Sequence, residues 1–117
     1  MYNLPMSGER KSVAFVDSAL DDLRDFPEDA RRQAGFEIDR VEQGQEPTDW
    51  RAMPDVGAGV NEIRIHEDGE HRVLYVAKFS EAIFVLHCFE KKTQKTAKKD
   101  IELAKKRYKA VAREQAK

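Results

Sequence analysis

Three consecutive segments near the middle of the chain have the residue pattern of β-strands. The first two are VNEIRI at residues 60–65 and HRVLYV at residues 71–76, and the third is IFVLHCFEKK at residues 83–92. β-Branched and aromatic residues make up half of the first two segments and four of the ten residues of the third, and short connections rich in polar residues separate them. We therefore predict a three-stranded antiparallel meander as the centre of the fold.

The first turn decides which side chains of the meander share a face. A two-residue turn at Asp68 and Gly69 would place the Arg72 guanidinium among the isoleucines of the first strand, which is costly if that face is the core. A three-residue loop starting at Glu67, with Gly69 left-handed, instead sets Arg64 opposite Arg72. We predict this second register, because it collects apolar side chains on one face. That face contains Ile63, Ile65, Val73 and Tyr75.

The second turn sets the last strand against the middle one. An even loop at residues 79–80 places Arg72 opposite His87 and Tyr75 opposite Phe84. One row across the sheet then contains Arg64, Arg72 and His87. Strand interiors normally hold few cations, so this row predicts a surface that binds an anion, and a phosphodiester is the commonest candidate.

Helices are predicted before and after the meander. Residues 11–16 suit a short first strand, Asp17 or Ser18 caps a brief helix through Phe26, and Pro27 starts a second helix that runs to about residue 43. Residues 45–59 are predicted as a loop. The second helix has an apolar stripe of Ala30, Ala34, Ile38 and Val41, which we expect to cover the sheet face of Ile63, Ile65, Val73, Tyr75, Phe84 and Leu86.

A last helix from Thr96 has a second apolar stripe. The stripe consists of Ala97, Ile101, Ala104, Tyr108 and Val111. The cationic face of the sheet is expected to carry Leu74, Val76, Ile83 and Val85 as well. That apolar strip is too large to stay bare on a monomer, so the last helix or a protein partner should cover it.

Composition limits the class of protein. With 117 residues and 40% hydrophobic residues, residues 1–117 suit one domain, with residues 1–10 as a loose arm. The single cysteine, Cys88, excludes an intramolecular disulfide, and no apolar run is long enough for a signal peptide or a membrane span. We expect a cytoplasmic protein that does not associate with membranes.

The net charge of −1 conceals an uneven distribution along the chain. Residues 1–57 hold 7 Lys and Arg against 13 Asp and Glu, whereas residues 88–117 hold 11 against 4. The cationic part begins where the last strand ends. Such a division suits a protein that presents one edge to nucleic acid, although a charged terminal helix is often only a solvated face.

The order of the elements and three sequence pieces together resemble a known family. The pieces GAGVNEIRI, HRVLYVAKF and FVLHCFEKKT, within a chain of strand, two helices, meander, basic turn and C-terminal helix, resemble the RelE/HigB-like toxins of type II toxin–antitoxin systems, particularly their phage-related branch. The resemblance covers residues 11–109. It implies an α+β fold with a mostly antiparallel sheet, two N-terminal helices packed on one face and a C-terminal helix. It also implies mRNA cleavage on the ribosome without metal or cofactor, and silencing by a helix-turn-helix antitoxin similar to HigA.

Cleavage of RNA by its own 2′-oxygen requires a base, stabilisation of charge on the phosphate oxygens, and a proton for the leaving 5′-oxygen. We assign Arg64 and Arg72 to the phosphate, because a guanidinium stays charged and grips two oxygens. His87, Lys91 and Lys92 are alternative proton carriers, since imidazole titrates near neutral pH and a lysine among other cations loses its proton more readily. The sequence does not divide the roles among these three. Further RNA contacts are assigned to Phe89, Lys95, Lys98 and Lys99, with Phe89 stacking on an unpaired base.

Each candidate also has a purely structural interpretation. Arg64 and Arg72 can pair with Glu62 and Glu70 across the hairpin, a contact worth roughly 0.2 to 1 kcal/mol. His87 can be a hydrogen-bonded core histidine, Phe89 a partly buried aromatic, and the lysines ordinary turn residues. A metal patch of His66, His71 and the acidic turn between them is discounted for lack of ligand spacing. The alternative function is therefore a noncatalytic protein of the same fold that binds RNA or a protein partner.

Overall fold

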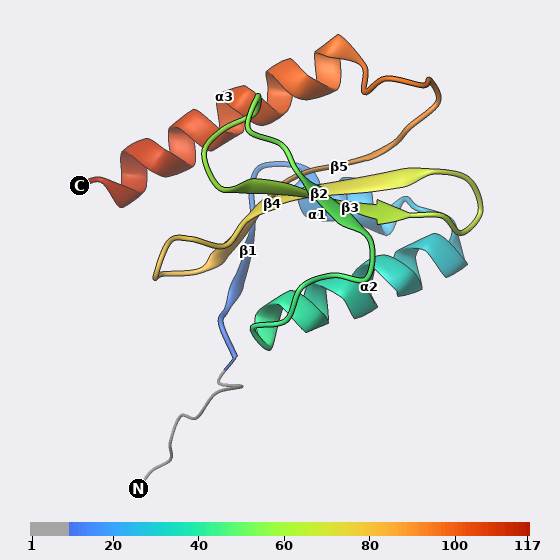
Figure 1. Cartoon of the computed structure of the whole chain (residues 1–117), viewed down its shortest axis with the longest axis horizontal. Coiled ribbons are helices and arrows are strands. Elements are labelled where there is room, and N and C mark those ends of the chain that lie inside the picture. Colours follow the sequence, from blue (N-terminus) through green and yellow to red (C-terminus); the bar gives the residue numbers. More distant parts are fainter. Residues whose placement is uncertain (1–9) are drawn as a thin grey trace, which may run out of the picture.

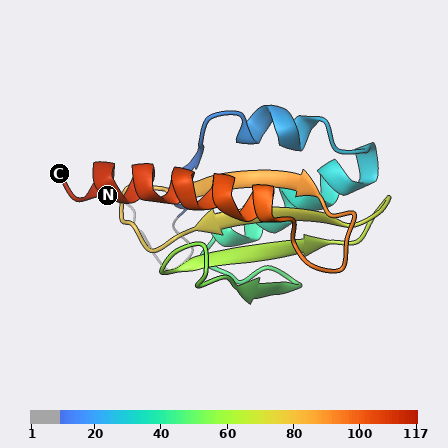
Figure 2. The same ribbon diagram turned by 90° about the horizontal axis from the view of Figure 1, so that it is seen from above.

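The computed structural model of the protein describes residues 10–117, which form a five-stranded mixed sheet and three helices (Figures 1 and 2). In chain order the elements are β1 (Val13–Phe15), α1 (Ala19–Arg24), α2 (Glu28–Glu42), β2 (Trp50–Ala52), β3 (Val60–Ile65), β4 (His71–Val76), β5 (Ile83–Glu90) and α3 (Lys98–Gln115). The loose arm predicted for residues 1–10 lies outside the described residues except for Arg10, which pairs with Asp39 at 2.7 Å. Pro27 is the N-cap of α2 and not its first-turn residue.

The sheet has the strand order β1-β5-β4-β3-β2, and all neighbouring pairs are antiparallel except β1 and β5. The predicted register of the first hairpin is confirmed, because Arg64 lies opposite Arg72. Asp68 and Gly69 both have positive φ, at 53° and 101°, in the turn that produces this register. The hydrophobic pattern thus predicted this register correctly.

The predicted register of β5 against β4 is wrong. Arg72 lies opposite Phe89, and His87 lies opposite Leu74, so Arg72 and His87 are diagonal neighbours. Tyr75 lies opposite Val85 and not opposite Phe84. The physical cause is an irregularity between Leu74 and Tyr75, where β5 contains one more residue than β4.

This bulge reverses the faces of the first half of β5. Ile83 and Val85 belong to the core beneath α1 and α2, whereas Phe84 and Leu86 lie on the α3 side; the sequence analysis predicted the opposite. His87 and Phe89 remain on the predicted α3 side, because the extra residue precedes them. A single inserted residue therefore exchanges every side chain on one side of it and leaves the rest unchanged.

Two apolar cores lie on the two faces of the sheet. The stripe of α2, together with Ala19, Leu23 and Phe26, covers Ile63, Ile65, Val73 and Tyr75 as predicted. On the other face Ala104 and Val111 of α3 pack with Leu74, Val76 and Leu86. The last helix thus covers Leu74 and Val76 of the predicted apolar strip, whereas Ile83 and Val85 of that strip belong to the other core. Figure 2 shows α3 running along the sheet on the side away from α2.

The segment predicted as a loop contains β2 and a buried connection. β2 pairs with β3, with Arg51 opposite Glu62. After it, Met53 and Val56 are buried against α3. Gly57 lies so close to the Tyr108 ring that a Cβ on this glycine would be 2.4 Å from a ring carbon. The connection therefore packs as part of the second core.

Candidate nucleic-acid interface

A cluster of three arginines surrounds one buried glutamate on the α3 side of the sheet. Glu62 is 1% exposed, and its Oε1 accepts a hydrogen bond from Arg51 Nε at 3.1 Å. The Nε atoms of Arg64 and Arg72 lie 3.6 and 3.9 Å from the same oxygen. The geometry follows from strand alternation and register, since Glu62 and Arg64 are two residues apart and Arg72 lies opposite Arg64.

Arg72 is held from its outer side as well. Its Nη1 donates to Glu70 Oε1 at 2.9 Å and to the His71 carbonyl at 3.0 Å, and the residue is 6% exposed. The pairs stated as the structural alternative are thus present, although each joins residues two apart along the chain and does not cross the hairpin: Arg64 pairs with Glu62, and Arg72 pairs with Glu70. Both arginines already have carboxylate partners in this structure.

His66 connects this cluster to the surface. Its Nε2 lies 2.6 Å from Asp49 Oδ2, and its Nδ1 lies 2.8 Å from Glu70 Oε2. These hydrogen bonds, first to Asp49 and then to Glu70, raise the pKa of His66, whereas the bond to His66 lowers the pKa of Glu70. An imidazole that bonds two carboxylates through both nitrogens is the protonated form, so His66 is a cationic bridge between them.

His87 is paired with an acidic residue of α3. Its Nε2 lies 2.7 Å from Asp100 Oδ1, and its ring stacks on Phe89 with 4.8 Å between centroids. His87 is 5% exposed, and its Nδ1 has no hydrogen-bond partner among residues 10–117. The carboxylate fixes the orientation of the ring and accepts from Nε2, so Nδ1 is an acceptor in the neutral ring.

A cavity of about 270 Å³ lies beside this pair, between the end of β5 and the start of α3. Its lining contains Phe89, Glu90, Lys91, Lys92, Thr93, Ala97, Lys99 and Asp100. Lys92 is exposed, whereas the Lys91 ammonium donates to the Gln94 carbonyl at 2.5 Å. Four of the predicted residues are thus brought together, namely Phe89, Lys91, Lys92 and Lys99. His87 contacts the cavity through Asp100.

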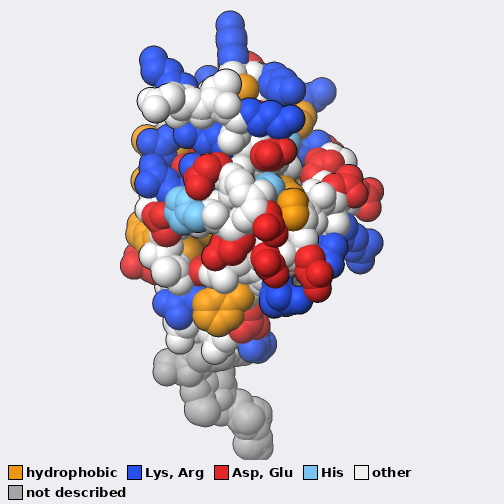
Figure 3. Space-filling view, turned by 90° about the vertical axis from the view of Figure 1, so that its right-hand side faces the viewer, with side chains coloured by type: hydrophobic (Ala, Val, Ile, Leu, Met, Phe, Trp, Pro, Cys, Tyr) orange, Lys and Arg blue, Asp and Glu red, His pale blue; other side chains and the backbone are white. Residues whose placement is uncertain are grey.

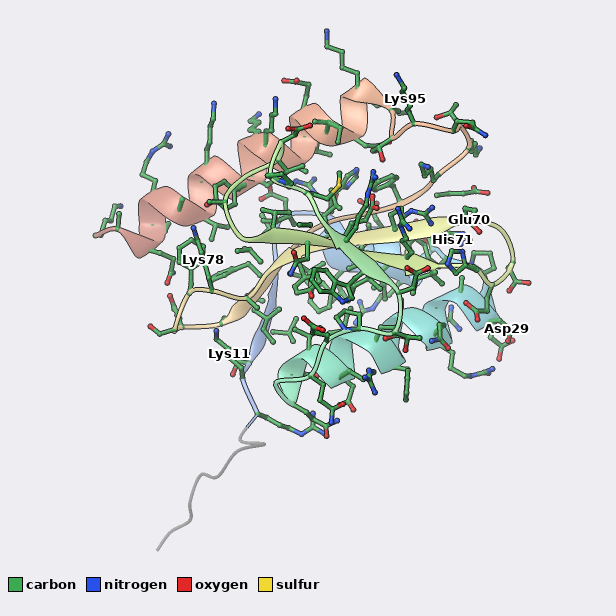
Figure 4. The ribbon with its side chains drawn as sticks, viewed as in Figure 1. Lys11, Asp29, Glu70, His71, Lys78 and Lys95 are labelled. Carbon is green, nitrogen blue, oxygen red and sulfur yellow. The ribbon has the colours of Figure 1, made fainter. Side chains whose placement is uncertain are left out.

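The other predicted residues are not part of this cavity. Arg72 lies on β4 directly opposite Phe89, which lines the cavity, and Arg64 lies one strand further away. Lys95 lines a separate cavity of about 390 Å³ that also includes Arg51, and Lys98 is exposed at the first turn of α3. Figure 4 shows Lys95 beside the start of α3, away from Glu70 and His71 at the hairpin turn.

Charge is segregated at this end of the molecule. In Figure 3 basic side chains gather at the top, where α3 and the loop before it lie, and acidic side chains gather below them. The uneven charge along the chain therefore becomes an uneven charge on the surface, as the sequence analysis predicted.

Three residues that make buried polar contacts near the candidate site were not predicted from the sequence. Asp100 follows a run of lysines at a helix start, and a carboxylate there usually serves only the helix dipole. Arg107 is buried in the apolar stripe of α3, where it donates to the Leu86 carbonyl at 2.9 Å and to Ser18 Oγ at 3.0 Å. Its position, three residues after Ala104 and four before Val111, was the available signal. Arg51 lay in the segment predicted as a loop.

Two negative findings apply to residues 10–117. No group of three His, Cys, Asp or Glu side chains there is arranged to hold a metal ion. Within the same residues, none of the helices has the length and apolar character needed to cross a lipid bilayer.

Comparison with known proteins identifies the family. The chain belongs to the family described as Phage derived protein Gp49-like (DUF891), whose model matches residues 21–109, about three quarters of the chain. This family is a member of the RelE/HigB-like toxins, which agrees with the resemblance found in the strands. No curated protein matches the chain.

Proposed function

We propose that this protein is the toxin of a type II toxin–antitoxin system and cleaves mRNA on the ribosome without a metal ion. The observation that carries the proposal is the His87–Asp100 pair, which lies beside a lysine-lined cavity and diagonally across from Arg72. A proton carrier, an orienting carboxylate and several cations thus lie at one end of the sheet. Membership of a phage-derived, toxin-like family supports the same function.

In the proposed reaction the 2′-oxygen attacks the adjacent phosphorus and the 5′-oxygen leaves, which forms a 2′,3′-cyclic phosphate and a 5′-hydroxyl. Lys91, Lys92 and Lys99 hold the phosphates at the cavity, and His87 moves a proton while Asp100 orients it. Lys91 and Lys92 remain the alternative proton carriers. The true carrier is the one whose replacement by alanine changes the pH dependence of cleavage.

Arg72 can bind the substrate phosphate only if the Glu70 carboxylate moves away from the guanidinium. Glu70 is the exposed partner of Arg72, with a side chain 44% accessible, whereas Glu62 is fully buried and stays in place. A substrate phosphate can therefore replace the Glu70 carboxylate at the outer edge of the guanidinium while Glu62 holds its inner edge. The exchange preserves the charge balance of the cluster, because one anion replaces another.

A second candidate function is supported by the same cluster. Because both arginines already have carboxylate partners, this protein can instead be a noncatalytic binding protein derived from a toxin. The two functions differ in whether replacing the proton carrier removes cleavage while the protein still binds its partner.

Inducible expression in bacteria with 5′-end mapping of cellular mRNA tests the proposal. The toxin should produce cuts inside translated frames and arrest growth, and His87→Ala should remove both. Arg113→Ala, which removes an exposed cation near the end of α3, is the matched control and should cut normally. Normal growth with intact message on expression of the wild type favours the noncatalytic binding protein.

Two further tests address the proposed partner and the proposed absence of a metal requirement. A small helix-turn-helix antitoxin encoded beside this gene should restore growth and copurify with the protein. On free RNA, cleavage should persist in EDTA and leave a 5′-hydroxyl end. A 5′-phosphate product would contradict the reaction, and a harmless protein without such a neighbouring gene would contradict the toxin assignment.

A further inference from the structure

A series of alternating charges runs along the outer edge of the arginine cluster, in the order Arg72, Glu70, His66, Asp49 and Arg64. Glu70 Oε1 accepts from Arg72 Nη1 at 2.9 Å, and the two Glu70 oxygens lie 3.0 and 2.8 Å from His66 Nδ1. On the other side of the ring, His66 Nε2 lies 2.6 Å from Asp49 Oδ2, and Asp49 Oδ1 lies 3.9 Å from Arg64 Nη1. Each carboxylate is therefore shared between one arginine and the same imidazole.

The first hairpin and the edge strand produce this arrangement. His66 follows the last residue of β3, and Glu70 precedes the first residue of β4, so both belong to the turn between these strands. Figure 4 shows Glu70 at this end of the sheet. Asp49 comes directly before β2, and its carbonyl accepts from the Arg64 amide at 2.9 Å, which extends the pairing of β2 with β3 by one residue. Backbone pairing thus brings the two carboxylates to the two sides of one ring.

The two shared carboxylates are free to change partner. The side chains of Asp49 and Glu70 are 41% and 44% exposed, whereas that of Glu62 is 1% exposed and stays with the arginines. When Glu70 leaves Arg72, protonated His66 still holds it. A neutral ring has a single N–H and cannot donate to both carboxylates, so at least one of them then depends on its arginine alone. That arginine is less available to another anion.

We propose that His66 is a positioning residue that controls whether Arg64 and Arg72 are open to the phosphates of RNA. The protonated ring retains Glu70 and Asp49 while the phosphates replace them at the guanidinium groups. The neutral ring releases them to the arginines. The charge of the ring acts in the same direction, because a protonated imidazole adds one positive charge beside the incoming anion. This inference rests on the proposed function and names the residue that regulates its arginine pair.

The groups that face His66 set the direction of the pH dependence. Asp49 and Glu70 bond the ring, Glu67 accepts from the His66 backbone amide at 3.2 Å, and the two arginines lie behind the ring-bonded carboxylates. The hydrogen bonds to Asp49 and then to Glu70 raise the pKa of His66 above 6.5. RNA affinity should therefore be highest below the pKa of His66 in the folded protein and fall as the pH rises through it. By reciprocity, bound RNA should raise this pKa further.

The probe is a rhodamine-labelled 2′-O-methyl hexauridylate, which cannot be cleaved through its blocked 2′-oxygens. Fluorescence anisotropy measures its dissociation constant with the full chain from about pH 6 to about pH 8.5, at a fixed ionic strength of about 0.1 M. The wild type should bind at least about threefold more weakly at the upper end of this range, whereas His66→Asn should change by less than about 1.5-fold. In NMR titrations the His66 ring should titrate at a higher pH with the probe bound than without it.

Two variants of matched charge separate the release of Glu70 from a general change of charge. Glu70→Gln removes the carboxylate that competes for Arg72, so its gain in affinity over the wild type should be at least about twofold larger at the upper end of the pH range than at the lower end. Glu67→Gln removes a carboxylate from the same turn that bonds only a backbone amide among residues 10–117, and its gain should be the same at both ends.

The proposal is overturned if His66→Asn keeps the pH dependence of the wild type, if the two glutamine variants gain affinity alike at both ends of the range, or if the probe does not bind below about 1 mM. Cleavage of unmodified RNA by the wild type is measured separately. A protein that cleaves RNA but binds the probe without pH dependence would refute only this inference. A protein that shows the expected pH dependence and does not cleave would refute only the proposed cleavage.

Discussion

Replacing Glu62 by glutamine tests what the arginine cluster contributes to stability. Glutamine keeps the size of the side chain and one oxygen that can accept from Arg51, and it replaces the charged carboxylate by a neutral amide. Arg72 is then left 6% exposed, with Glu70 as its remaining carboxylate. An ion pair at 3.9 Å is worth about 4 kcal/mol at an effective dielectric constant of about 20.

The net loss is smaller, because the substitution also removes the cost of burying the carboxylate. Arg51 and Arg64, with side chains 49% and 35% exposed, recover solvation and contribute less than about 1 kcal/mol each. We expect Glu62→Gln to lower the free energy of unfolding by about 3 kcal/mol and the melting temperature by about 10 °C.

Urea unfolding followed by far-UV circular dichroism measures this change. The matched control is Glu67→Gln, in the exposed hairpin turn, which should stay within about 0.5 kcal/mol of the wild type. The denaturant slope should not change, since the unfolded surface is the same. A Glu62→Gln protein as stable as the control would refute the conclusion that the buried carboxylate holds β2, β3 and β4 together.

Two further predictions concern packing and pH. Gly57→Ala should destabilise the protein by about 1 to 3 kcal/mol, because the new Cβ would lie 2.4 Å from a carbon of the Tyr108 ring. Gly35→Ala, on α2, should stabilise the protein by about 0.5 to 1 kcal/mol, because the new Cβ would have no atom within 4 Å. Thermal melts that ranked the two variants in the opposite order would contradict this packing. The pKa of His66 is raised in the folded protein, so its contribution to stability is complete below pH 6.5 and is lost as the pH rises through the pKa of the folded state. The pKa of Glu70 is lowered, so its contribution is present above pH 4.5 and is lost as the pH falls through the pKa of the folded state. Their pairing should therefore stabilise the protein most between pH 4.5 and 6.5, and His66→Asn should flatten that maximum, by less than about 1 kcal/mol because the side chains are exposed.

The sequence predicted those parts of the fold that the hydrophobic pattern controls directly. The opposition of Arg64 and Arg72 followed from keeping a guanidinium out of the core, and the helices followed from their apolar stripes. The register of β5 was not predictable in this way, because either register leaves apolar residues on both faces. The bulge beside Leu86 decides between them, and it has no marker such as glycine in the local sequence.

The sequence predicted several residues of the candidate site but not the contacts between them. Strand ends and basic turns indicated the lysines around Phe89, which the structure does bring together. The partner of His87 comes from Asp100, thirteen residues later and on a different element, and that contact depends on where α3 crosses the sheet. β2 was missed because three residues between prolines carry too little pattern to identify a strand.

Initial rates of RNA cleavage by purified Arg72→Ala, Arg72→Lys and wild-type protein test the central claim most directly. All three should be folded by circular dichroism, and Arg113→Ala is the control for loss of one cation. Removing a preorganised guanidinium typically costs about 10² to 10³ in rate, and lysine should not restore it fully because an ammonium cannot make the two-pronged contact. We predict that Arg72→Ala loses cleavage to this extent while Arg113→Ala cleaves normally. A folded Arg72→Ala protein that cleaves as fast as the wild type would show that the cross-strand cluster is not the active site.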